Sequence, residues 1–135
     1  MTNTLLYKPV VYLLVLCLLL VSCNTVKLAG YDQKAYENAT TLKPETLAPV
    51  SKSSTSDGYA NNQDQVEKLF IRLESAFEYA NGIDYNNEAV NNWRNMISET
   101  LEDWHEEWKN NQSLTPVGAS EIRNQIGLEF DTIIS

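Results

Sequence analysis

The chain has 135 residues, and its 18 acidic and 10 basic side chains give a formal net charge of −8. This charge argues against nucleic acid as a partner. Binding a polyanion requires clustered cations, and the basic residues here occur singly. The length fits one domain, and no repeat with the period of a solenoid is present.

The N-terminus is typical of an export signal. A polar lead with one positive charge, Lys8, precedes twelve uninterrupted apolar residues from Val10 to Val21. A helix rises about 1.5 Å per residue and the hydrocarbon core is about 30 Å thick, so a membrane span needs about 20 apolar residues. The run is too short for a span, and the pattern predicts a signal peptide over residues 1–22.

This run ends in Leu20-Val21-Ser22-Cys23. The tetrapeptide resembles the cleavage box of bacterial lipoprotein precursors. The resemblance implies cleavage before Cys23, a thioether-linked diacylglycerol on its thiol and an acyl chain on its freed amine. Ser22 supplies the small residue that the peptidase requires. The alternative is that Cys23 lies by chance near an ordinary cleavage site or in an uncleaved anchor.

A lipidated Cys23 would attach the protein lastingly to a membrane, because two or more acyl chains hold far better than one. No thiol would remain for a disulfide, since Cys17 lies in the signal peptide. Residues 23–30 then form a short lipidated tether. Asn24 lacks the charge of the aspartate that retains enteric-type lipoproteins in the inner membrane. This implies the periplasmic face of the outer membrane, or the outer face of the plasma membrane in a single-membrane host.

An N-terminal helical arm is predicted over residues 31–50, where Ala35, Ala39 and Leu42 recur at helical spacing. Pro44 predicts a kink or a break. The pattern from Tyr31 to Leu47 is similar to the start of small, uncharacterised helical bacterial lipoproteins, which implies the helical class but no activity.

A flexible linker is predicted over residues 51–63, which are rich in serine and contain Gly58. The remaining residues, 64–135, are predicted to form a helical bundle. Its three helices are expected from about Asp64 to Asn81, from about Asn87 to Asn110, and from the cap Thr115 to the C-terminus.

The second bundle helix has the clearest apolar face, with one stripe running from Val90 to Trp108. Glycine at position 82 is expected to end the preceding helix in the left-handed conformation. No segment shows sustained strand alternation. The predicted fold is therefore all-α, a small up-down bundle of three to four helices with the arm docked as the fourth.

Three residues form a possible interaction surface, Glu102, Glu106 and Trp108. Two carboxylates can serve as acid and base in glycan cleavage or can hold Ca²⁺, but these lie opposite the tryptophan stripe and are better explained as a solvated acidic face. Trp108 lies at a helix end and is expected to be the most exposed of the three tryptophans, where it could contact a sugar ring or a peptide.

The sole histidine, His105, begins a pattern like that of zinc proteases, but Lys109 stands where the second histidine is required. It is expected to be a solvated residue beside acids. The sequence predicts no metal site, no catalytic set, no small-molecule substrate and no cofactor other than the lipid on Cys23.

The function predicted from these patterns is that of a membrane-anchored bacterial envelope lipoprotein, a non-catalytic structural or protein-interaction module with an envelope protein as partner. Two alternatives stay open. One is an envelope protein that binds or hydrolyses glycans through Glu102, Glu106 and Trp108. The other is a phage- or plasmid-encoded exclusion or lysis lipoprotein.

Overall fold

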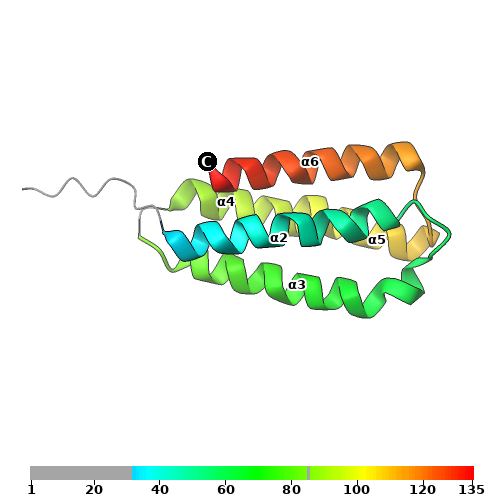
Figure 1. The fold of residues 1–135 in the computed structure, drawn as a ribbon, viewed down its shortest axis with the longest axis horizontal. Helices are drawn as coiled ribbons and strands as arrows, with labels where there is room; N and C mark the ends of the chain where they lie inside the picture. The colour runs from blue at the N-terminus through cyan, green and yellow to red at the C-terminus, as the bar shows by residue number, and fades with distance from the viewer. Residues whose placement is uncertain (1–31, 85) are drawn as a thin grey trace, which may run out of the picture.

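The computed structural model describes residues 32–84 and 86–135 (Figure 1). Their elements are α2 (Gln33–Lys52), α3 (Tyr59–Asn81), α4 (Asn87–Asn95), the π-helical η1 (Met96–Leu101), α5 (Glu102–Asn111) and α6 (Pro116–Ile134). No strand occurs in this part of the chain, which confirms the all-α class. The predictions for residues 1–31, including Leu20-Val21-Ser22-Cys23 and the tether, lie outside the described residues. Among those described, no helix is both long and apolar enough to cross a bilayer.

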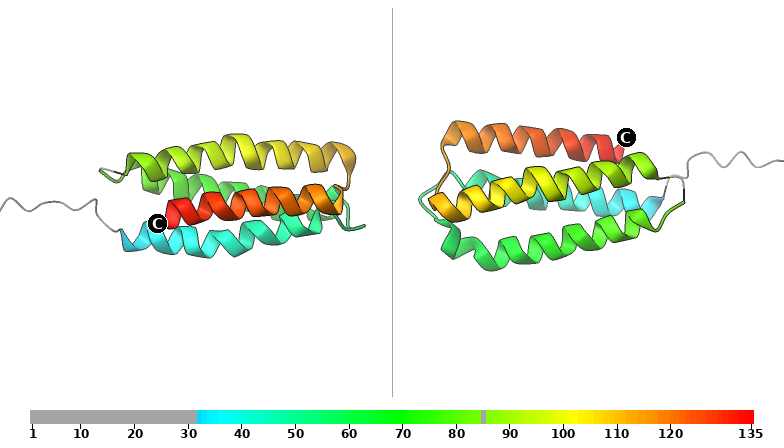
Figure 2. Two further views of the ribbon diagram at one scale, coloured as in Figure 1. Left: turned by 90° about the horizontal axis from the view of Figure 1, so that it is seen from above. Right: turned by 180° about the vertical axis from the view of Figure 1, so that it is seen from behind.

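The helices pack as four rods, because α4, η1 and α5 follow one another without interruption (Figures 1 and 2). The rod α4–η1–α5 and α2 each pack against both α3 and α6. One end of the bundle, here called the entry end, contains the start of α2, the start of α4 and the end of α6 (Figure 1). The opposite end, the loop end, contains the connections 53–58 and 112–115.

Helix α2 does not break at its prolines. It runs without interruption to Lys52, with Pro44 and Pro49 inside it, so the break that was one of the two outcomes expected before Pro44 does not occur. A proline inside a helix costs about 3 kcal/mol or more. Leu42, Thr46 and Val50 of this helix are buried in the bundle, and their packing outweighs that cost. The expected arm is thus a full member of the core.

The predicted linker is shorter than residues 51–63, because only residues 53–58 separate α2 from α3. Asn62 is buried in the first turns of α3, and its amide donates hydrogen bonds to the carbonyls of Asp57 and Gly58 at 3.1 Å each. The N–H of Leu114 donates to the carbonyl of Ser53 at 2.7 Å. The bonds of Asn62 fix the connection 53–58 to α3, and the bond of Leu114 joins the two connections of the loop end.

The helix ends agree with the sequence at one place and differ at another. The hydroxyl of Thr115 accepts the N–H of Gly118 at 3.1 Å, and Pro116 begins α6, as predicted. Gly82 follows α3 but has a φ of −81°, so the expected left-handed conformation is wrong. Its N–H donates to the carbonyls of Glu78 and Tyr79, which continues the right-handed turn.

The π-helical segment lets both of its end residues face the core. Met96 and Leu101, its first and last residues, are buried, as are Trp93 before it and Trp104 after it. Leu101 follows Met96 by five positions, a step that would place the two side chains about 140° apart around an α-helix. A π turn contains about one residue more than an α turn, so residues five positions apart can lie on the same face. Ile97, which the regular spacing placed on the apolar face, is accordingly only partly buried.

We expect deletion of the exposed Ser98 to convert the π turn into an α turn and to keep both buried faces aligned. The unfolding free energy should fall by less than about 1 kcal/mol, as for a surface change. Deletion of the exposed Glu106 is the matched control, because it rotates Trp108 away from the core and should cost about 3 kcal/mol or more. Chemical denaturation followed by circular dichroism measures both. Equal losses for the two deletions would contradict this role of η1.

Candidate functional site

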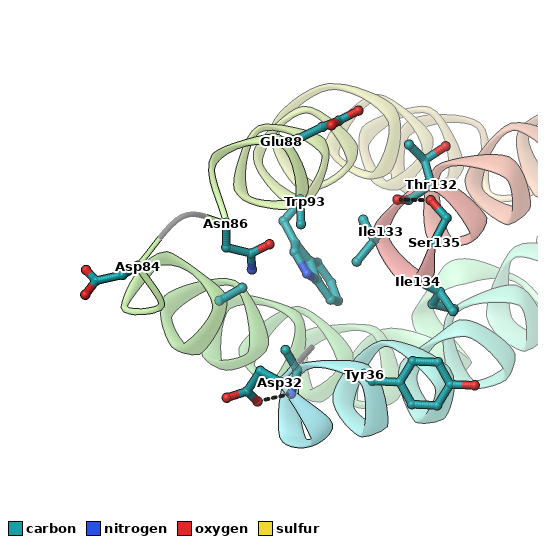
Figure 3. A pocket seen from close by; sticks show the side chains of 13 residues that line it. Asp32, Tyr36, Asp84, Asn86, Glu88, Trp93, Thr132, Ile133, Ile134 and Ser135 are labelled. Atoms are coloured by element: carbon teal, nitrogen blue, oxygen red, sulfur yellow. Dashed lines mark hydrogen bonds between the residues drawn. The ribbon is translucent and has the colours of Figure 1, made fainter. Parts of the chain in front are cut away.

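A cavity of about 480 Å³ opens at the entry end, between the first residues of α2, the end of α3, the start of α4 and the end of α6 (Figure 3). Its volume lies within the range of small-ligand sites, roughly 300–1,000 Å³. Four separate elements therefore build it. Its lining residues are Asp32, Ala35, Tyr36, Ala80, Asp84, Asn86, Glu88, Ala89, Trp93, Thr132, Ile133, Ile134 and Ser135.

The inner wall of the cavity is apolar and carries Trp93. This side chain comes from α4 and projects between α2 and α6 (Figure 3). It is only 2% exposed, and its ring packs edge-on against Phe130 with the centroids 5.6 Å apart. Ala35, Ala80 and Ala89 line the same space from α2, α3 and α4. Together with the indole, these three methyl groups make this wall of the cavity apolar.

Three carboxylates, Asp32, Asp84 and Glu88, carry negative charge in the lining. Asp84 and Glu88 extend away from Trp93 and lie at the margin of the cavity (Figure 3). Asp32 caps α2, since its Oδ1 accepts the N–H of Ala35 at 2.8 Å, and a carboxylate there also interacts favourably with the helix dipole. The site thus combines an apolar wall with an acidic margin.

Asp32 is also held by Tyr79 of α3, whose hydroxyl donates to the two carboxylate oxygens at 3.1 and 3.2 Å. Partial desolvation, followed by the hydrogen bond to Asp32 and its negative charge, raises the pKa of Tyr79. The phenol therefore remains a hydrogen-bond donor at neutral pH. This bond ties the start of α2 to α3 beside the cavity.

The structure does not bring together the residues of the predicted interaction surface. Trp108 is 0% exposed, so the expectation that it is the most exposed tryptophan is wrong. Its ring packs against Trp104 at 5.5 Å and edge-on against Tyr59 at 5.5 Å. Tyr59 covers it because α3 begins five residues earlier than predicted. Glu102 and Glu106 are exposed, and neither lines the cavity at the entry end.

His105 is only partly exposed, which corrects its expected position as a solvated residue beside acids. Its Nε2 lies 2.6 Å from the hydroxyl oxygen of Tyr59, and its ring contacts those of Tyr59 and Phe70 at 5.4 and 5.3 Å. The histidine therefore joins α5 to α3. Within residues 32–84 and 86–135, no three His, Cys, Asp or Glu side chains are grouped to hold a metal ion.

A polar cluster at the π-helical segment was not predicted from the sequence. Oε1 of Glu129 accepts hydrogen bonds from Thr100 at 2.7 Å and Gln125 at 3.2 Å, and Gln125 also donates to Thr100 at 3.0 Å. The other carboxylate oxygen of Glu129 is buried without a hydrogen-bond partner. No local pattern signals this cluster, because Thr100 and Glu129 are 29 residues apart. Its bonds tie η1 to α6.

No protein-family model, curated protein or solved structure matches the chain. The class of protein is therefore defined by its own features. In the described part of the chain these are an all-α bundle of four rods and, at the entry end, a cavity with an apolar wall and an acidic margin.

We expect Tyr59→Phe to lower the unfolding free energy by about 1 kcal/mol at pH 7, because it removes the hydrogen bond to His105 in a partly buried site. Tyr79→Phe is the control. It also removes a hydrogen bond, but its hydroxyl is exposed and water replaces the contact, so the loss should be smaller. Urea unfolding measures both variants. An equal or larger loss from Tyr79→Phe would contradict the expected role of Tyr59.

Alkaline pH gives a second test of Tyr59. Burial, and then the charge of Glu67, raises its pKa above the ordinary value of 10.0. The stabilisation from the protonated phenol is therefore complete below about pH 10 and is lost as the pH rises through the folded-state pKa. Stability of the wild type should fall more steeply above pH 10 than that of Tyr59→Phe. Identical pH profiles in urea unfolding would count against the shift.

Proposed function

We propose that the protein is a small up-down helical bundle, anchored by lipid on Cys23 in the bacterial cell envelope, that binds a partner protein at the entry-end cavity. One observation carries this proposal. Asp32 lines the cavity and is also the first described residue after the proposed tether. The cavity and the attachment to the membrane thus belong to the same end of the molecule.

The length of the chain limits how far the cavity can lie from the lipid. Nine residue steps separate Cys23 from Asp32, a distance of at most about 30 Å at roughly 3.5 Å per residue. This limit applies to any conformation of the intervening residues. A partner in the same membrane is therefore within reach of the cavity. The absence of charge at Asn24 supports the periplasmic face of the outer membrane as the location.

Binding accounts for the described side chains better than the catalytic alternative. His105 is engaged by Tyr59, and Asp32 caps a helix. The glycan-binding alternative relied on Trp108 as an aromatic platform, and burial of this side chain removes the platform. The cavity provides the concave, partly apolar surface that binding requires.

The anchor is tested with labelled palmitate in the native host. Cys23→Ala should abolish labelling, because the acylated thiol is lost, whereas Cys17→Ala should leave it unchanged. The second variant is a matched control, since both change one cysteine near the end of the same apolar run. Palmitate on the Cys23→Ala variant would overturn the lipoprotein assignment.

The binding surface is tested by site-specific photocrosslinking in intact cells. A photoreactive residue at the exposed position of Asp84, on the cavity margin, should give a discrete adduct with an envelope protein. The same residue at the exposed position of Glu106, away from the cavity, should not. The same adduct from both positions, or none from position 84, would contradict binding at the entry end.

A further inference from the structure

We propose that the entry-end cavity receives a lysine side chain of the partner protein. The inference rests on the proposed function for the identity of the partner, but it concerns a chemistry that the cavity presents by itself. The lining combines apolar groups on its inner wall, including Trp93 and Ile133, with carboxylates at its margin. An occupant that matches both parts needs an apolar stem and a cationic end.

The charge of the lining selects the sign of the occupant. Asp32, Asp84 and Glu88 come from three different segments, and none of the described residues that line the cavity is Lys, Arg or His. Lys34, close in sequence to Asp32, lies over the ring of Tyr79 at 5.5 Å from its centroid and lines the neighbouring groove between α2 and α3 instead. An anionic group would face three carboxylates without a counter-charge in the lining. A cation is attracted by all three.

Lysine fits this arrangement because its side chain has a long apolar stem and ends in a compact cation. Its aliphatic stem can pack on apolar surface while the ammonium stays near water, which matches an apolar wall inside a solvated acidic margin. The volume of about 480 Å³ leaves room for neighbouring atoms of the partner as well as the stem.

Two related cations fit less well. A guanidinium favours two parallel hydrogen bonds to one carboxylate, but both oxygens of Asp32 already accept hydrogen bonds. Asp84 and Glu88 lie apart at the margin (Figure 3). An ethanolamine headgroup has a short stem and carries a phosphate, which would be repelled by the same margin. The compact ammonium on a long stem is therefore the better match.

The test uses the full-length lipidated protein in dodecyl maltoside with 5-fluorotryptophan in place of tryptophan. Of the three tryptophans, Trp93 lines the cavity, while Trp104 and Trp108 are buried elsewhere and serve as internal controls in ¹⁹F NMR. N-acetyl-lysine amide is the probe. N-acetyl-norleucine amide has the same stem without the ammonium, and phosphoethanolamine represents the lipid headgroup.

The lysine probe should shift the Trp93 resonance in a saturable way and leave the other two unchanged. It should bind about threefold more tightly than the norleucine probe, which is the size expected for contacts between exposed charges. The double variant Asp84→Asn, Glu88→Gln should remove most of this difference. Glu102→Gln, Glu106→Gln removes the same charge from an exposed face outside the cavity and should not. Asp32 is kept, because it caps α2.

Three outcomes would overturn the proposal. Equal binding of the lysine and norleucine probes would show that the cavity is only an apolar hollow. Tighter binding of phosphoethanolamine would assign it to a lipid headgroup. No shift with any probe would show that it binds neither. Each result leaves palmitate labelling at Cys23 and crosslinking at position 84 to decide the proposed function separately.

Discussion

One wide helical turn, η1, lets the long rod that carries all three tryptophans stay packed against the core through its middle. Its first and last residues, Met96 and Leu101, are both buried, although a step of five positions would place them about 140° apart around a regular α-helix. On either side of this turn the rod directs Trp93 into the core near the entry end, and Trp104 and Trp108 into the core near the loop end. Trp93 also lines the cavity, so the site is built on the same rod.

The two ends of the bundle differ in the side chains that fill them. At the loop end, aromatic rings fill the space between α3 and α5, and Asn62 and Leu114 tie the connections by hydrogen bonds. At the entry end, alanines from three helices line the cavity together with Trp93. The entry end is thus a concave surface that combines apolar and acidic side chains.

Local patterns were sufficient to predict the helices and the cap of α6, because periodic apolar residues and the Thr115-Pro116 pair act over a few residues. They were insufficient where distant contacts decide. Helix α2 continues through Pro44 because its neighbours bury Leu42 and Thr46, and α3 starts at Tyr59 because that ring packs on Trp108. Neither segment carries a local sequence signal of these distant contacts.

The cavity was missed for the same reason. Small side chains line it that are far apart in the chain and have no distinctive spacing. The sequence pattern instead indicated an exposed acidic face as the interaction surface. The residues that create the space are Ala35, Ala80 and Ala89. Trp93 lines the same space, but it was predicted as core and is nearly fully buried, so this second position has no signal in the apolar stripe.

The central claim is that the lipid anchor holds the cavity end of the bundle at the bilayer. Energy transfer to acceptor-labelled headgroups in proteoliposomes measures this directly, with the donor on a cysteine introduced at Asp84 on the cavity margin or at Ser56 in the loop end. Helix α2, of 20 residues, separates the two ends by about 30 Å. The account predicts clearly more efficient transfer from position 84. Equal transfer from both positions, or stronger transfer from position 56, would contradict it.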